Sequence, residues 1–80
     1  MDYDYYIGLL ESTLGIEFYA EEAELITEYL KENLDEIIHE FISIQDDSFY
    51  YMKPEKKEKL VDEAVIDDLI IYYNKNIKEN

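Results

Sequence analysis

The chain has 80 residues, with 21 Asp and Glu against seven Lys and Arg, which gives a formal net charge of −14 at pH 7. Because 48% of the residues are apolar and none is cysteine, we expect one acidic domain over residues 1–80, without disulfides or thiolate metal sites. The negative field disfavours direct binding to nucleic acid or an anionic membrane. No apolar run approaches the ~18 to 20 residues that span a bilayer, and the amino terminus opens with acids. We therefore expect a cytoplasmic protein with a basic protein partner.

The charge is unevenly distributed along the chain. Residues 1–52 contain 14 acids and one base, Lys31, whereas residues 53–80 contain seven acids and six lysines. The sequence has only two glycines and one proline, and it contains neither a linker-like tract nor an internal repeat. The acidity is therefore expected to belong to the first two-thirds of one compact unit.

A first helix is predicted from about residue 4 to residue 14. Asp2 or Asp4 would cap its start, and Gly15 in a left-handed conformation would end it. The apolar face predicted for this helix consists of Tyr6, Leu9, Leu10 and Leu14.

A second, longer helix is predicted over residues 17–44, because apolar residues recur there at alternating steps of three and four. Asn33 followed by Glu36 resembles a capping box, so a break into two helices at residues 33–35 is the alternative. The predicted apolar stripe consists of Ala23, Ile26, Leu30, Leu34, Ile37, Phe41 and Ile44.

Residues 45–53 are predicted to form a loop or a short extended segment. Pro54 fits the first turn of a last helix that runs to about Ile77. The β-branched and aromatic run at 69–73 also suits a strand. The predicted fold class is therefore all-α, a bundle of three or four helices, and the alternative is α+β with a short hairpin from 49–52 and 69–73.

Acidic residues also recur at helical spacing. At 100° per residue, six of them fall within an arc of roughly 80° on the side of the helix opposite the apolar stripe. These six are Glu17, Glu21, Glu24, Glu28, Glu32 and Asp35. Residues 17–40 would extend ~34 Å as a helix, comparable to one turn of B-DNA. Like charges four residues apart cost about 0.2 to 0.5 kcal/mol each, and five such pairs occur in this stretch. The predicted binding residues are Glu17, Glu21, Glu24, Glu28, Glu32, Asp35 and Glu36.

A linear array of carboxylates imitates the charge of a nucleic-acid backbone, and a basic partner would relieve its repulsion. In size, acidity and lack of catalytic motifs, the chain is similar to phage-borne inhibitors of restriction or CRISPR nucleases. That similarity implies a DNA mimic acting in the host cytoplasm on a basic nucleic-acid-binding protein or nuclease. A solvated helix face selected for solubility is the competing explanation of the charge.

Seven of the nine tyrosines gather near segment ends, within residues 3–6, 50–51 and 72–73, and in each adjacent pair we expect one ring in the core and one exposed. Exposed tyrosines are good interface anchors. The segment 46–54, with Asp46, Asp47, Tyr50 and Tyr51 before Pro54, resembles the inhibitory loop of colicin nuclease immunity proteins, which are small acidic helical bundles. This resemblance implies an alternative function, an immunity protein or antitoxin that blocks a toxin by direct contact.

Catalytic motifs are not found in the sequence. His39 is the only histidine, and its Glu-x-x-His step with Glu36 is one copy of a pattern that di-iron bundles use twice. We therefore predict no enzyme activity, no cofactor and no metal. A third function class is a helical assembly or adaptor protein that self-associates as a homodimer through the near-neutral residues 54–77.

Overall fold

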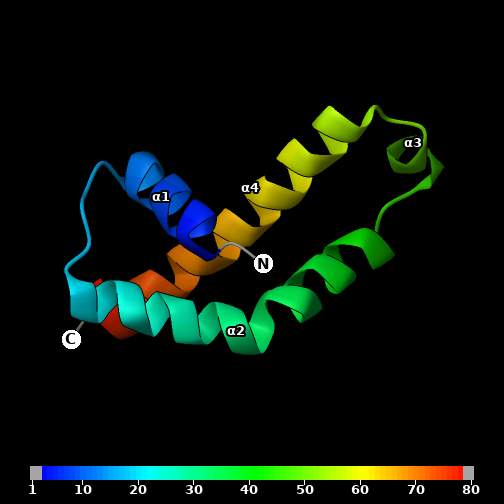
Figure 1. The fold of residues 1–80 in the computed structure, drawn as a ribbon. Coiled ribbons are helices and arrows are strands. Elements are labelled where there is room, and N and C mark those ends of the chain that lie inside the picture. The colour runs from blue at the N-terminus through cyan, green and yellow to red at the C-terminus, as the bar shows by residue number, and fades with distance from the viewer. Residues whose placement is uncertain (1–2, 79–80) are drawn as a thin grey trace.

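The computed structural model describes residues 3–78 and contains helices joined by short connections (Figure 1). No strand occurs within these residues, so the all-α prediction is confirmed and the hairpin alternative is wrong. The segment 69–73 lies inside the last long helix. The elements are α1 (Tyr3–Leu14), α2 (Ala20–Ser43), α3 (Asp47–Tyr50), α4 (Pro54–Tyr73) and a π-helical turn, Asn74–Lys78.

Gly15 ends α1 as predicted. Its φ of 69° is in the left-handed region, and its backbone N–H donates to the Glu11 carbonyl at 2.8 Å. Asp4 lies in the first turn of α1 and is not its cap, and Asp2 lies outside the described residues. The Glu11 carboxylate then accepts from the Phe18 backbone N–H at 2.8 Å, which fixes the connection to α2.

Helix α2 is continuous from Ala20 to Ser43, so the predicted break at 33–35 is wrong. The Asn33 amide donates to the Tyr29 carbonyl four residues earlier, at 2.9 Å, instead of capping a new helix. The helix changes direction near its middle without losing its helical hydrogen bonding (Figure 1). It begins three residues later than predicted because the Tyr19 backbone N–H donates to the Glu22 carboxylate at 2.9 Å, which caps the helix at Tyr19.

The core lies where α1 crosses the first half of α2 and the second half of α4. Leu10, Leu30 and Leu69, one from each helix, are fully buried. Ile44, predicted for the apolar stripe, is instead 79% exposed, because it follows the end of α2 beyond the core. The core cluster consists of Ile7, Leu10, Ile26, Leu30, Leu34, Val65, Ile66 and Leu69.

Beyond this core, α2 and α4 diverge toward α3, which connects their far ends (Figure 1). The segment predicted as a loop is a short helix there, because Asp46 caps it through the Ser48 backbone N–H at 3.1 Å. Phe49 is buried and meets Phe41 edge-on, with ring centroids 5.8 Å apart. Pro54 then begins α4 as predicted, and a π-helical turn carries that helix past Ile77.

None of the helices in the described part of the chain is long and apolar enough to cross a membrane.

We predict that Leu30→Ala lowers the free energy of unfolding by about 2 to 5 kcal/mol, because it leaves a cavity where the three helices meet. Leu25→Ala, on the exposed side of the same helix, is the matched control and should cost less than about 1 kcal/mol. Urea unfolding followed by circular dichroism measures both variants. Equal losses would contradict this assignment of the core.

The two glycines should respond in opposite directions to alanine. Gly8→Ala should stabilise the protein by about 0.5 to 1 kcal/mol, since Gly8 is inside α1 and an added Cβ meets no atom within 4 Å. Gly15→Ala should destabilise it by about 1 kcal/mol because of the positive φ. Thermal unfolding of the two variants tests the assignment, and a stabilised Gly15→Ala would refute the cap.

Candidate partner-binding surfaces

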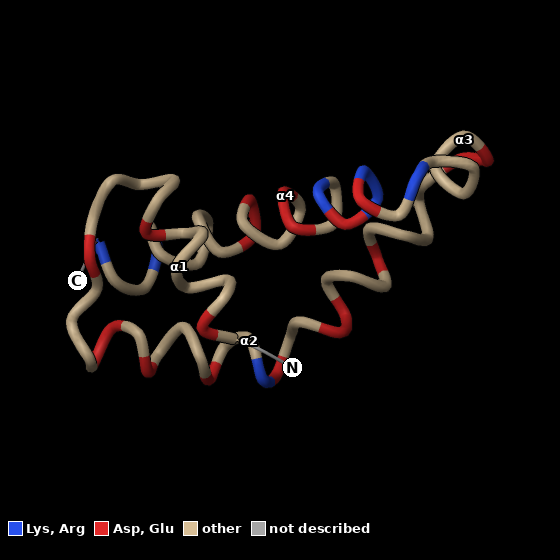
Figure 2. The backbone as a smooth tube through the Cα atoms, turned by 45° about the horizontal axis from the view of Figure 1, so that its top comes forward, with Lys and Arg blue, Asp and Glu red and all other residues tan. Residues whose placement is uncertain are grey.

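The α2 acidic face is the set of predicted carboxylates that the structure places on one exposed side of α2. All of them are exposed, and Glu21 and Glu36 are separated by about 22 Å of helix. Within residues 3–78 the one ion pair is Lys31 with Glu28, at 3.8 Å, and both of its side chains are more than half exposed. Figure 2 shows the acids distributed along α2. The members of the face are Glu21, Glu24, Glu28, Glu32, Asp35 and Glu36.

Glu17 does not belong to this face, which corrects the prediction. It is exposed in the connection 16–19, before α2 begins. The left-handed Gly15 and the bond from the Phe18 N–H to Glu11 give this connection a path that a continuous helix would not take. The array therefore begins at Glu21 and is shorter than the sequence predicted.

The remaining predicted residues gather around α3, which we call the α3 tip. Tyr50 is 53% and Tyr51 is 88% exposed, so the expectation that one ring of this pair is buried is wrong. Phe49 takes the inward position instead. Asp47 is exposed, whereas the Ser48 hydroxyl and backbone N–H donate to Asp46 and lower the pKa of its carboxyl. The structure places this tip at the far end of α2, away from its amino terminus (Figure 1).

Tyrosine hydroxyls connect the helices by donating to carboxylates of α4. Tyr5 of α1 donates to Asp62 Oδ2 at 2.6 Å, and Tyr29 of α2 donates to Asp68 Oδ2. The Tyr29 ring also stacks on Tyr72, with ring centroids 4.1 Å apart. These bonds orient both carboxylates and leave their negative charge in place, whereas a lysine would neutralise it.

Burial and the neighbouring carboxylates raise the pKa values of three tyrosines. Burial, followed by the negative charge of Asp62, raises the pKa of Tyr6 to about 12. Burial and the hydrogen bond to Asp68 raise the pKa of Tyr29 further. The bond to Asp62 is the main reason that the pKa of Tyr5 is also raised.

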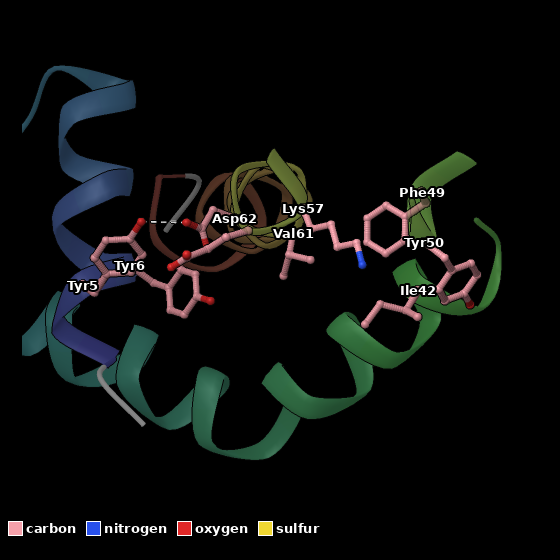
Figure 3. A pocket seen from close by; sticks show the side chains of 9 residues that line it. Tyr5, Tyr6, Ile42, Phe49, Tyr50, Lys57, Val61 and Asp62 are labelled. Atoms are coloured by element: carbon pink, nitrogen blue, oxygen red, sulfur yellow. Dashed lines mark hydrogen bonds between the residues drawn. The ribbon is translucent and has the colours of Figure 1, made fainter. Parts of the chain in front are cut away.

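Two open cavities lie on either side of the Tyr5–Asp62 bond. The first, of about 640 Å³, opens where α2 and α4 diverge (Figure 3). Its apolar walls include Ile42, Phe49 and Val61, and the Lys57 amine lies 5.8 Å from the centre of the Phe49 ring. The cavity therefore combines an apolar interior with charged edges.

The second cavity, which we call the α1/α4 groove, has a volume of about 610 Å³. Five carboxylates and one lysine line it over an apolar floor. Charge along the sequence does not reveal this groove, because residues 53–80 are almost neutral in sum. A helical projection gives part of the signal, because Glu55, Asp62 and Ile66 fall within about 40° of one another.

Within the segment 54–77 predicted for self-association, the apolar run 69–73 packs largely against the rest of the bundle. Leu69 is buried, and Ile70, Tyr72 and Tyr73 are half-buried against the rest of the bundle. Of the run 69–73, Ile71 alone remains exposed, at 56%.

Within residues 3–78, no group of three or more His, Cys, Asp or Glu side chains is arranged to hold a metal ion. His39 and Glu36 are both exposed on α2. No family model matches this chain, and the searches of curated proteins and of solved structures also gave no match.

We predict that tyrosines held against carboxylates of α4 titrate late. Tyr6, whose pKa is raised to about 12, and Tyr29, whose pKa is raised further, should ionise above the ordinary tyrosine value of about 10. Since the folded-state pKa values are raised, the native state binds these protons more tightly than the unfolded state. Their contribution to stability is complete below pH ~10 and is lost as the pH rises toward 12.

Absorbance at 295 nm during alkaline titration measures this late ionisation. Tyr29→Phe should remove one late-titrating ring. A single step for all nine tyrosines, with a midpoint near 10, would contradict the prediction.

Proposed function

We propose that this protein is a small, non-enzymatic inhibitor that binds the basic nucleic-acid-binding surface of another protein, in the manner of a DNA mimic. The observation that carries the proposal is the α2 acidic face, six exposed carboxylates on one helix that also bears a single lysine. A basic surface built for phosphates would meet evenly spaced negative charge along this face.

The dimensions of the molecule support this proposal. It measures 41 × 22 × 20 Å along its principal axes. Residues 3–78 contain 19 acids and seven lysines, a net charge of −12, or about one net charge per 3.4 Å of length. Double-stranded DNA carries one charge per about 1.7 Å, so the protein has about half the linear charge density of a duplex.

The electrostatic cost of the array also supports a basic partner. Four like-charge pairs at i,i+4 remain on α2 between Glu24 and Glu40. Each costs roughly 0.2 to 0.5 kcal/mol, together about 1 to 2 kcal/mol in a domain of marginal stability. Arg and Lys of a partner would convert this repulsion into attraction, and the long-range field would accelerate association.

The experiment that tests the proposal uses tagged protein to capture partners from a lysate of its source cell, with elution by a salt step. We expect a basic nucleic-acid-binding protein that moderate salt releases and added DNA displaces. Glu24→Lys with Glu28→Lys should weaken this partner by at least tenfold, about 1.4 kcal/mol. Binding of the folded double variant is measured by titration at several salt concentrations.

The matched control is Asp4→Lys with Glu17→Lys, two exposed acids that do not belong to the α2 acidic face. It changes the net charge equally, so it should weaken binding far less if the position of the charge matters. Undiminished binding by Glu24→Lys with Glu28→Lys would refute the mimic. Equal weakening by both pairs would reduce the role of α2 to its contribution to net charge.

The α3 tip favours a second candidate, an immunity protein or antitoxin that blocks a toxin by direct contact. Two exposed tyrosines at the end of the molecule suit an interface anchor, because Tyr gives large contact area at low entropic cost. In this case Tyr50→Ala with Tyr51→Ala should cost about 2 kcal/mol or more in affinity, without changing its salt dependence. Isothermal calorimetry against the captured partner measures this, and an unchanged affinity would eliminate the candidate.

A further inference from the structure

We propose that the α1/α4 groove is a second binding surface, which takes a short segment of the partner that carries arginine beside an apolar side chain. The inference rests on the proposed function only for the basic character of the partner. It assigns binding to a part of the chain that the sequence predicted to be near-neutral.

The α1/α4 groove is strongly negative. Five carboxylates line the groove against the single lysine Lys59, and the other lysines at the start of α4 are not among its lining residues. No lysine lies within 4.0 Å of any of these carboxylates in the described part of the chain. The groove therefore concentrates uncompensated negative charge. Its carboxylates are Glu55, Glu58, Asp62, Glu63 and Asp67.

The floor of the groove is apolar. Ile66 is buried, and Leu9 and Ile70 are half-buried, so the floor is fixed by the same core that holds α1 on α4. An arginine side chain matches this combination, since its aliphatic stem packs on apolar surface while its guanidinium pairs with carboxylates in two-pronged geometry. Lysine would supply charge but not the planar fork.

One carboxylate of the groove is already held in position by a hydrogen bond. The Tyr5 hydroxyl donates to Asp62 at 2.6 Å, which holds this carboxylate in place at the groove's edge. A carboxylate already held by one donor loses less conformational freedom when an arginine binds its remaining lone pairs. The tyrosine leaves the negative charge available for the partner.

The groove and the α2 acidic face belong to different sides of the molecule. In Figure 2, the first half of α2 runs along the lower edge of the bundle and α4 along the upper edge, and each carries acids. A flat basic surface would contact one of them at a time. A partner that encloses its nucleic acid in a cleft would contact both.

The test is an NMR titration of the protein, labelled at its isoleucine and leucine methyls, with a blocked Arg-Leu-Arg peptide. We expect saturable shifts at Leu9, Ile66 and Ile70. Replacing arginine by the uncharged citrulline should weaken binding at least tenfold, and replacing the central leucine by glycine should weaken it at least threefold. Thr13→Trp, an exposed position at the groove, should block the peptide at least fivefold.

Two charge-matched variants separate the groove from the general field. Glu63→Gln with Asp67→Asn should weaken the peptide at least threefold, whereas Glu24→Gln with Glu32→Gln on α2 should change its affinity less than twofold. Circular dichroism confirms the fold of each. Shifts confined to α2, or equal weakening by both pairs, would overturn the inference. Because the peptide replaces the partner, this result is independent of the charge-reversal test of the proposed function.

Discussion

The structure depends on one small apolar core, in which α1, α2 and α4 meet around Leu10, Leu30 and Leu69. Every buried side chain of the described residues is apolar, and no charged or polar side chain is buried. An 80-residue chain cannot bury many more side chains, so this cluster must offset both chain entropy and the mutual repulsion of the carboxylates. The consequence is that every charged side chain of the described residues remains at least partly exposed.

Tyrosine side chains join the helices of this bundle without reducing its negative charge. Among the described residues, the side-chain hydrogen bonds that join different long helices all come from tyrosine hydroxyls: Tyr5 to Asp62, Tyr29 to Asp68, and Tyr72 to the Leu25 carbonyl. Lysines in these positions would also pair with the carboxylates, but each would remove one unit of negative charge. Tyrosine supplies packing area and a donor while the net charge stays strongly negative. This gives a physical reason for three of the nine tyrosines in such an acidic chain.

Local signals were sufficient for most of the fold. The apolar spacing that predicts α2, the glycine that ends α1 and the proline that begins α4 each act through neighbouring backbone, so they are readable without tertiary contacts. The start of α2 was predicted three residues too early, because the cap that Glu22 gives Tyr19 acts together with the bond from the Phe18 N–H to Glu11, which sets the path of the connection. Helix α3 depends likewise on Phe49 finding Phe41 on another helix.

The candidate surfaces differ in the same way: one follows from the spacing within a single helix, and the other depends on how two helices pack. Six carboxylates of α2 could be predicted because one helix alone sets their spacing, whereas Glu17 was lost with the unexpected connection. The α1/α4 groove could not be predicted from charge along the chain, because the seven acids and six lysines of residues 53–80 nearly cancel in sum. They separate only in three dimensions, where the docking of α1 turns one side of α4 into a groove and leaves most of its lysines outside.

The two acidic surfaces differ in how their charges are held, and this suggests different parts in binding. On α2 the carboxylates have no interhelical partner among the described residues, so in the proposed complex they would act mainly through the long-range field. In the groove, Asp62 is held by Tyr5 over an apolar floor, so in the same proposal close contacts there would set the dissociation rate. A partner steered by α2 and held at the groove would need to surround the bundle. Duplex-binding clefts have this shape, and the proposed mimicry is therefore one of enclosure as well as of charge.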